Sequence, residues 1–324
     1  MEKKILIYNS GGGLGDAIQL FPLLLSLKNH FNKSNFFYLG AHENHYKNKL
    51  REYNLSLETI DLDLKYFGFR WWHFLKVKQK IRDKKIIKFD LIIDLQSKLR
   101  NTIVLKKIPC DDFFSSTFNF LFCTKKNKYL SNKNNMPLNI LLNLEIFLNI
   151  KIKKIDFDLK SLATKYIKES ERLLPGKNYI GFAITQGNTY RQKSWPISNF
   201  IELAKKYIST GKEIVFFLEK TEKNLMNSIK KELPNALFPE NESQISCPAL
   251  VTALALRLEK AITIDNGVMH MMALAKIPMI VLFGPTNSKK FSPKEKNVKI
   301  LDSKNLYKTN DISKITVEDV FNCS

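Results

Sequence analysis

The first residues that suggest chemistry form a glycine-rich segment near the N-terminus, Ser10–Asp16 (SGGGLGD). Its glycines would let backbone amides approach a ligand closely, and the helix start expected next favours negative charge. Two nucleotide-binding patterns fail here. No Gly-Lys-Ser/Thr follows the glycines, and the third glycine of GxGxxG would fall on Asp16 or Ile18. Asp16 has two interpretations: it stabilises the helix dipole, or it projects a carboxylate into a ligand site at the edge of a parallel sheet.

The second candidate is Lys193 in a Lys-Ser-Trp-Pro sequence, between an expected strand and an expected helix. In such a loop, above the edge of a sheet, an ammonium could neutralise a phosphate. The alternative is a solvated surface lysine beside Trp195, a residue that more commonly anchors packing.

The third and most specific candidate lies in AITIDNGVMHMMALAKIPMIVLFGP (261–285), which has the pattern strand, turn, helix, strand. Asn266 is a good N-cap residue, and Gly267 lets the chain turn tightly into the helix. The free amides there suit an anion such as a diphosphate, and His270 lies about one turn further along. Alternatively, Asp265 and Asn266 only cap the helix and His270 packs against the sheet.

Two patterns that resemble metal sites are set aside. His42-Glu43-Asn44-His45 lacks the HExxH spacing that places two histidines on one helix face. The Asp-x-Asp pairs at 61–63 and 156–158 lie in apolar/polar alternation, where the carboxylates most simply face solvent on a strand. We therefore expect no metal.

These residues need strands and helices to position them, and the sequence predicts both. Apolar runs alternate with amphipathic stretches, a pattern typical of parallel α/β units. The predicted strands are 4–9, 35–39, 57–62, 89–94, 179–185, 213–218, 261–265 and 279–283. The predicted helices are 16–29, 137–149, 198–209, 222–233, 249–256, 268–275 and 315–321. The expected architecture is two doubly wound α/β domains facing each other, and Pro175-Gly176, at the end of an amphipathic stretch, is the candidate boundary between them.

Composition limits the class of protein further. The chain has 324 residues, 44% hydrophobic and 26% charged, which excludes wholesale disorder. No uncharged apolar run reaches the roughly 18 residues of a membrane-spanning helix. The start MEKKILIYNS enters a strand directly, so we expect no signal peptide. Four cysteines without paired spacing fit a reducing cytoplasm, at positions Cys110, Cys123, Cys247 and Cys323.

The formal net charge of +21 comes from 52 basic and 31 acidic residues. Only seven of the cations are Arg, the residue suited to bidentate phosphate and base contacts, and the lysines are spread along the chain. This pattern favours a Lys-rich solvated surface over nucleic-acid binding. Attraction to an anionic membrane or an acidic substrate is the second interpretation.

Together the motifs resemble glycosyltransferase family 9, the lipopolysaccharide heptosyltransferases, over nearly the whole chain. The matching segments are Gly15-Asp16 with Phe21-Pro22, Asp94-Leu95-Gln96, Lys193–Pro196, Asp265–His270, Pro278, Phe283–Thr286 and Ile312–Val320. The resemblance implies a GT-B fold, in which two Rossmann-like domains face each other across a cleft. It implies an acceptor-binding domain at 1–170, a donor-binding domain at 171–308, and a helix within 309–324 that returns to the first domain.

The resemblance further implies an inverting, metal-independent transfer without a cofactor. A heptose or similar sugar would pass from a nucleotide-diphosphate sugar, ADP-heptose first among them, to a lipopolysaccharide-core or other glycolipid or glycan acceptor. Asp16 would be the general base, buried in the cleft. Glu222 would contact the nucleoside, although Glu219 is equally near. The expected diphosphate site is Lys193, Asp265, Asn266, Gly267 and His270, with Lys193 also catalytic. The expected acceptor-side residues are Gly13, Gly15, Gln96 and Arg100.

Three positions depart from the family pattern. Asn266 replaces a hydroxyl residue, Ser97 replaces a glycine, and the N-terminal loop has additional glycines. The acceptor therefore need not be a standard core, nor the donor an ADP-heptose.

The alternative functions are a catalytically silent nucleotide-sugar-binding module and, less favoured, a basic nucleic-acid-binding protein. The failed GxGxxG disfavours a nicotinamide oxidoreductase. We expect a cytoplasmic protein with peripheral contact to anionic lipid of the inner membrane.

Overall fold

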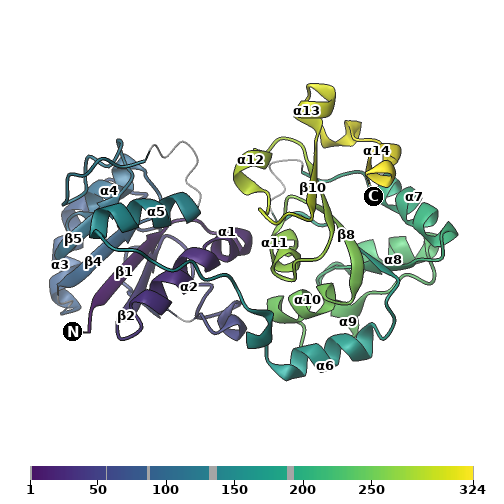
Figure 1. Cartoon of the computed structure of the whole chain (residues 1–324), viewed down its shortest axis with the longest axis horizontal. Helices are drawn as coiled ribbons and strands as arrows, with labels where there is room; N and C mark the ends of the chain where they lie inside the picture. The colour runs from purple at the N-terminus through teal and green to yellow at the C-terminus, as the bar shows by residue number, and fades with distance from the viewer. Residues whose placement is uncertain (1, 56, 86–87, 131–136, 188–192, 324) are drawn as a thin grey trace. The chain divides into compact units, whose positions relative to one another are not determined.

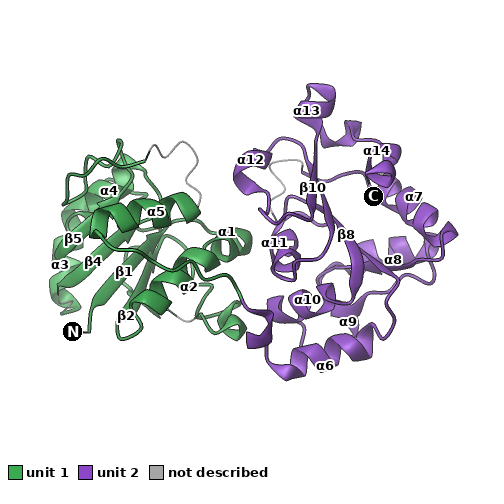
Figure 2. Ribbon diagram, viewed as in Figure 1, with its two compact units in different colours: residues 1–157 green, residues 158–324 purple. Residues whose placement is uncertain are grey.

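The computed structural model describes residues 2–55, 57–85, 88–130, 137–187 and 193–323 (Figure 1). The chain forms two compact units, Met1–Phe157 and Asp158–Ser324, which Figure 2 distinguishes by colour. Each unit is built on a five-stranded sheet in which every pair of neighbouring strands is parallel. The predicted α/β class is confirmed.

The sheet of the first unit has the order β3-β2-β1-β4-β5. Its strands are β1 (Lys4–Asn9), β2 (Asn35–Gly40), β3 (Glu58–Thr59), β4 (Phe89–Asp94) and β5 (Cys110–Ser115). Its helices are α1 (Leu14–Gln19), α2 (Phe21–His30), α3 (His73–Asp83), α4 (Leu99–Leu105), α5 (Pro137–Leu148) and a 3-10 turn at Arg51–Tyr53. Residues of α3 and α4 share one apolar core with β1 and β4, whereas α2 and α5 contact each other. Because helices cover the sheet, the central strands are buried almost throughout.

The second unit has the sheet order β10-β9-β8-β6-β7. Its strands are β6 (Tyr179–Ala183), β7 (Glu213–Phe216), β8 (Leu258–Ile264), β9 (Met279–Phe283) and β10 (Val298–Asp302). Its helices are α6 (Thr164–Leu173), α7 (Ile197–Ser209), α8 (Lys223–Glu232), α9 (Pro239–Glu242), α10 (Pro248–Ala255), α11 (Gly267–Leu274), α12 (Ser288–Phe291), α13 (Ser303–Tyr307) and α14 (Val317–Asn322). The 3-10 turns Leu159–Ser161 and Ile312–Lys314 complete its described elements. One core joins α7, α8 and α14 to the sheet, and α10 contacts both α6 and α11.

The elements differ from the sequence-based prediction where local signals are weak. The predicted helix 16–29 is two helices, α1 and α2, that meet at Leu20. Pro22, in the first turn of α2, has no amide to continue the α1 ladder, so a new helix starts there. The unpredicted strands β5 and β10 are edge strands whose exposed charged residues interrupt any apolar run.

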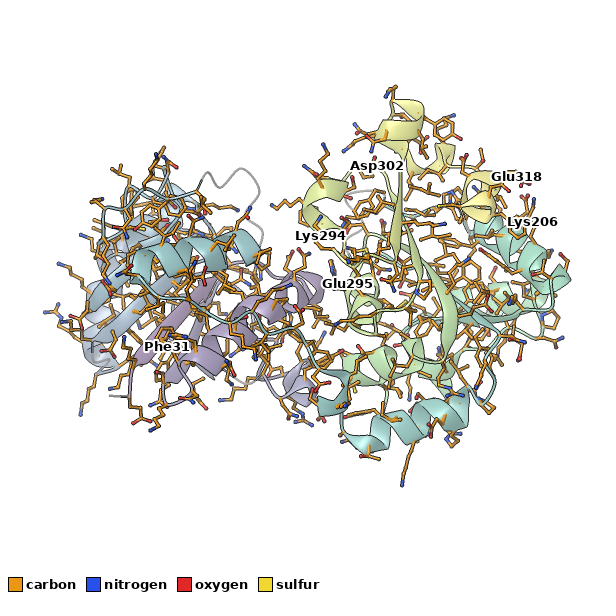
Figure 3. The ribbon with its side chains drawn as sticks, viewed as in Figure 1. Phe31, Lys206, Lys294, Glu295, Asp302 and Glu318 are labelled. Carbon is orange, nitrogen blue, oxygen red and sulfur yellow. The ribbon has the colours of Figure 1, made fainter. Side chains whose placement is uncertain are left out.

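The division of the chain also differs from the predicted boundary at 170/171. The two units separate between Phe157 and Asp158, because α6 packs against α10 of the second unit. The C-terminal helix α14, expected with the N-terminal domain, belongs to the second unit and packs against α7. An ion pair between Lys206 of α7 and Glu318 of α14 joins the two helices (Figure 3). Within the described residues, no helix is both long and apolar enough to cross a bilayer.

Candidate functional site

The second unit brings Lys193 and Asp265 into direct contact at the C-terminal edge of its sheet. The Lys193 Nζ donates to the Asp265 carboxylate at 2.6 Å and to the Asp265 backbone carbonyl at 3.2 Å. The two side chains are 16% and 9% exposed, so the ion pair is largely removed from water. A pair held this closely is a fixed positive and negative charge at the end of β8, rather than a solvated surface lysine.

The loop that carries Lys193 is anchored on both sides. The Lys193 amide donates to Oε1 of Gln186, beyond the end of β6, at 2.7 Å. Trp195 is buried and donates its indole N–H to the Ile315 carbonyl at 2.8 Å. Trp195 is therefore the packing anchor that the sequence predicted. The segment before α14 holds the Lys193 loop through this bond, a role that sequence reasoning did not assign to it.

Asn266 caps α11, as predicted. Its Oδ1 accepts the Met269 amide at 2.8 Å, and its Nδ2 donates to the carbonyls of Ala183 and Thr185 at 3.3 and 2.9 Å. The cap thus also ties the turn after β8 to the end of β6. The Asn266 side chain has separate accepting and donating atoms, Oδ1 and Nδ2, so it can make these bonds at the same time. A hydroxyl side chain is shorter and has a single oxygen for both roles. The remaining amides at the start of α11 suit an anion.

His270 lies in α11 and is 6% exposed. Burial lowers its pKa to about 4, with Asp265 opposing that shift and Lys193 adding to it. His270 is therefore a neutral imidazole near pH 7, able to donate one hydrogen bond without adding positive charge. His270 is packed in the core and lies within electrostatic reach of the Lys193–Asp265 pair.

Glu222 and Glu219 follow β7 on the same edge of the sheet, and both are exposed. Glu222 is the N-cap residue of α8 but makes no side-chain cap bond.

Sequence reasoning missed Glu240, which is 8% exposed. Burial raises the pKa of Glu240 to about 8, and the Glu219 charge adds to that rise. A buried carboxyl just after an apolar Leu-Phe-Pro segment is difficult to recognise from sequence, because its burial depends on the fold.

The first unit places Asp16 in the first turn of α1, with Gly13 as the N-cap residue. The carboxylate lies over the glycine segment: a Cβ added to Gly11 or Gly13 would stand 3.4 Å from Asp16 Oδ2. Asp16 is exposed. Gly15 is half-buried within α1. Asp16 therefore presents a solvent-accessible carboxylate at the C-terminal edge of the first sheet.

Gln96 lies beside this glycine segment although it follows a different strand. Its Nε2 donates to Asn9 Oδ1 at 2.5 Å, and the Gly11 amide donates to the same oxygen at 2.9 Å. Asn9 thus links the ends of β1 and β4, and sequence reasoning missed it. Arg100 is exposed and its guanidinium lies 4.8 Å from the centroid of the Phe69 ring.

Asp94, the last residue of β4, is a buried carboxylate that accepts several hydrogen bonds. It is 1% exposed and accepts hydrogen bonds from Thr102, Ser115 and the Gln96 amide at 2.6, 2.8 and 3.0 Å. Burial raises the pKa of this carboxyl, and the hydrogen bonds oppose the rise. Asp94 is therefore a structural residue that orients the backbone of Gln96.

The histidines of the rejected metal pattern support the glycine segment. His45 Nε2 lies 3.0 Å from the Gly12 carbonyl, and its Nδ1 lies 3.1 Å from Glu43 Oε1. A Cβ on Gly12 would stand 2.8 Å from the His42 ring, so this position needs glycine unless His42 moves. Among the residues that the structure describes, no three His, Cys, Asp or Glu side chains form a metal-binding group.

Comparisons with known proteins agree with this picture. Residues 74–321 match the model of glycosyltransferase family 9 (heptosyltransferase). A lipooligosaccharide heptosyltransferase 2 of Campylobacter jejuni is 25% identical over 300 residues, covering 89% of this chain and 83% of that protein.

Solved structures share the fold. A family 9 glycosyltransferase from Veillonella parvula has a TM-score of 0.70 and 21% identity, covering 99% of this chain and 96% of that one. The Escherichia coli heptosyltransferase WaaC, solved with ADP, has a TM-score of 0.69 and 15% identity, covering 99% and 98%. The structural likeness establishes the GT-B type of fold, and the match over more than half of the chain establishes the family. The chain belongs to glycosyltransferase family 9 and is a glycosyltransferase.

Proposed function

We propose that the protein transfers a heptose or similar sugar from a nucleotide-diphosphate sugar, ADP-heptose first among candidates, to a lipopolysaccharide-core or other glycolipid acceptor. The observation that carries the proposal is the largely buried Lys193–Asp265 pair beside the start of α11. A related protein is a lipooligosaccharide heptosyltransferase, and related structures were solved with ADP and an ADP-heptose analogue.

The donor would bind the second unit through its diphosphate. Lys193 uses two donor directions on Asp265, and an ammonium has a third N–H for a phosphate oxygen. The amides at the start of α11 would bind further phosphate oxygens, and neutral His270 would donate a hydrogen bond. Together these groups stabilise the charge that grows on the leaving diphosphate. Glu222 is proposed to contact the nucleoside.

The acceptor would bind the first unit at the glycine segment, near Gly13, Gly15, Gln96 and Arg100. Asp16 would take the proton of the acceptor hydroxyl while its oxygen attacks the anomeric carbon. The bond from that carbon to the diphosphate oxygen breaks, and the electron pair leaves with the nucleoside diphosphate. Attack opposite to the leaving group inverts the anomeric configuration. This mechanism assigns the charge stabilisation to Lys193 and backbone amides, without a metal.

The test combines donor binding with product analysis. ADP-, GDP-, UDP- and CMP-linked sugars are screened by thermal shift, because a ligand that binds only the folded state raises the melting temperature. The stabilising donor is then incubated with glycolipid acceptors, with and without EDTA, and NMR gives the anomeric configuration of the product. Inverted product and full activity in EDTA are expected. Retained configuration, loss of activity in EDTA, or donor binding without transfer to any acceptor would contradict the proposal.

Two lysine substitutions in the second unit, one at the candidate site and one control, test whether Lys193 binds the donor. Lys193→Met should abolish most of the donor-induced shift. Lys205→Met removes an exposed ion pair with Glu232 (2.9 Å) in the same unit and should leave the shift unchanged. Equal effects of the two substitutions would mean that Lys193 has no specific role in donor binding.

A further inference from the structure

The second unit contains a buried carboxyl group that the proposed reaction does not use. Glu240, in α9, is 8% exposed, and none of the described residues hydrogen-bonds to its carboxyl group. A polar group that leaves water without gaining a hydrogen-bond partner destabilises the folded state. Buried polar groups without a partner are rare in native proteins, and one reason to keep them is a ligand that supplies the missing bond.

α9 lies at the same edge of the sheet as the candidate diphosphate site. The segment just before α9 extends the sheet beyond β7, since Leu237 forms a parallel bridge with Val215 and its amide donates to the Ile214 carbonyl at 2.9 Å. Because the bridge is parallel, the chain leaves it toward the carboxyl ends of the strands. Glu240 follows three residues later and is therefore on the edge where ligands bind in sheets of this kind.

Two hydrogen bonds fasten α9 to the loop after β7, which is the loop proposed to contact the nucleoside. Asn241 Nδ2 donates to the Leu218 carbonyl at 3.1 Å, and Lys220 Nζ donates to the Ser243 carbonyl at 2.6 Å. One bond runs from α9 to the loop, and the other runs from the loop to the residue that follows α9. The position of Glu240 beside the proposed nucleoside site is thus fixed from both segments.

The order of the strands sets the distance between Glu240 and the candidate diphosphate site. Asp265 and the start of α11 follow β8, β6 and β7 come next in the sheet, and the Leu237 segment lies beyond β7. Neighbouring strands are about 4.8 Å apart, so this segment begins about 14 Å from β8. An extended nucleoside diphosphate covers a distance of this order. A donor with its diphosphate at the start of α11 can therefore reach α9 with its base.

Burial and the loop after β7 together favour the neutral form of Glu240. Burial raises its pKa to about 8, and the charge of Glu219, in that loop, adds to the rise. Lys220, the cation of the same loop, donates to the Ser243 carbonyl instead of to Glu240.

Helices α6 and α8 also direct their cations to other partners. In α6, Arg172 Nε donates to Glu169 Oε2 at 2.8 Å, and in α8, Lys230 Nζ lies 5.4 Å from the centroid of the Phe238 ring. None of the described cations pairs with Glu240, so its carboxyl group has no counter-charge. The other carboxyl groups that flank α9 or α8 are exposed, and they are Glu222 and Glu242.

A neutral carboxyl group offers a ligand both a donor and an acceptor. Its carbonyl oxygen accepts one hydrogen bond and its hydroxyl group donates another, whereas a carboxylate only accepts. Adenine presents the complementary pair, an amino group next to a ring nitrogen that accepts. The side-chain amide of Gln has the same arrangement of donor and acceptor, which is why Gln is a common partner of adenine.

We propose that Glu240, as a carboxylic acid, recognises the adenine base of the donor nucleotide. Its carbonyl oxygen accepts from the 6-amino group of adenine, and its hydroxyl group donates to the adjacent ring nitrogen. This inference deepens the proposed function and rests on its choice of an adenine nucleotide as the donor. It adds a residue that selects the base to the residues that bind the diphosphate. Because the carboxylate form cannot donate, adenine binding weakens when Glu240 ionises.

Calorimetric binding to the full chain tests the contact without any transfer reaction. The probes are ADP and purine riboside diphosphate, which lacks only the 6-amino group. The parent should bind ADP roughly tenfold more tightly or better. Glu240→Leu should weaken ADP binding by a similar factor and should no longer distinguish the probes, because the partner of the amino group is gone. Glu232→Leu removes an exposed carboxylate of α8 that pairs with Lys205, and it should keep the preference of the parent.

The pH dependence of binding separates a carboxylic acid from a purely structural role. Above about pH 7 the terminal phosphate of ADP is almost fully ionised. ADP binding to the parent should then weaken by roughly tenfold as the pH rises through 8 to about 9.5, because only the protonated form of Glu240 donates. Glu240→Gln keeps one donor and one acceptor at every pH. It should therefore bind ADP within about threefold of the parent at pH 7 and lack this fall.

Equal affinity of the parent for the two probes would overturn the proposal, and so would an unchanged preference for ADP in Glu240→Leu. An equal fall of ADP binding with pH in the parent and in Glu240→Gln would also overturn it, since another group would then titrate. Glu240→Leu should fold, because an apolar side chain replaces a buried carboxyl group that has no partner. Thermal unfolding checks this, and the Glu240→Gln comparison decides the proposal independently.

Failure of this inference can be told apart from failure of the proposed function. A Glu240-dependent preference for ADP in a protein that transfers no sugar would support the inference and contradict the proposed function. Sugar transfer from a donor with another base, whose binding Glu240→Leu leaves unchanged, would overturn the inference and leave the transfer reaction standing.

Discussion

The two units present their candidate residues in different electrostatic settings. In the second unit, Lys193 and Asp265 are a largely buried ion pair beside a neutral, buried His270. In the first unit, Asp16 is exposed over a glycine segment, and Asn9 Oδ1 connects this segment to Gln96 by accepting hydrogen bonds from the Gly11 amide and Gln96 Nε2. The second unit therefore has a fixed charge arrangement before any ligand binds, as expected of a site that stabilises a leaving group. The first unit instead presents a solvent-exposed carboxylate at Asp16.

The largest expected effect separates the two units by function. Asp16→Asn should lower the rate of transfer by about 10²- to 10⁴-fold, because the amide cannot accept the hydroxyl proton. Donor binding, measured by calorimetry, should stay within twofold, since the donor is assigned to the second unit. Near-parent turnover of Asp16→Asn would remove it as the base. Weakened donor binding would instead place part of the donor site in the first unit.

The next prediction tests how much the stability of the second unit depends on the Lys193–Asp265 ion pair. Lys193→Met should destabilise that unit by about 3 kcal/mol, because it leaves the Asp265 carboxylate buried and unpaired. The double variant with Asp265→Asn should recover much of the loss. Urea unfolding followed by Trp195 fluorescence, with Trp71 and Trp72 replaced by Phe, reports on this unit. Equal losses in the single and double variants would show that the pair is not coupled.

The stability of the second unit should depend on pH because of His270. Its pKa is about 4 when folded and near 6.5 when unfolded, so between these values only the unfolded chain binds the proton. Stability contributed by neutral His270 is thus complete above pH 6.5 and falls as the pH drops toward 4, by about 3 kcal/mol at most. His270→Gln should lose less stability than the parent between pH 7 and 4.5. Parallel pH profiles would contradict the lowered pKa.

Glu240 provides a control in the same unit, because its effect on the pH dependence of stability is opposite in sign to that of His270. Its pKa is raised to about 8, so between pH 4.5 and 8 the folded state holds a proton that the unfolded state has lost. Its contribution is complete below pH 4.5 and disappears as the pH rises through 8. The pH profile of Glu240→Gln should therefore diverge from the parent profile in the direction opposite to that of His270→Gln.

The smallest effect concerns the glycine segment of the first unit. Gly12→Ala should slow transfer by roughly tenfold, because the new methyl group meets the His42 ring and displaces the segment that precedes Asp16. Adding His42→Ala should restore most of the rate, since His42 is exposed and its ring can be removed at little cost. Steady-state kinetics on the single and double variants check this. If the second substitution gives no rescue, the contact with His42 does not position the segment.

Much of the fold and part of the candidate site follow from local sequence. Central strands such as 89–94 are continuous apolar runs, and helix starts such as Asn266-Gly267 have a cap residue followed by glycine, so periodicity and capping identify them. Edge strands β5 and β10 carry exposed charges, and the break between α1 and α2 depends on one proline, so these features were missed. The place of α6 is not readable from sequence, because α6 is amphipathic in isolation and only its contact with α10 assigns it to the second unit.

By itself, the sequence determined the fold class, the family, and the turns that carry Asp16, Lys193 and Asp265–His270. These features depend on residues adjacent in the chain, where glycines, caps and apolar periods act locally. The tertiary structure alone decided which distant side chains meet: Asn9 with Gln96, His45 with Gly12, and Lys193 with Asp265. Such contacts arise only when parallel strands bring their carboxyl ends to one edge, because no local pattern specifies a partner tens of residues away.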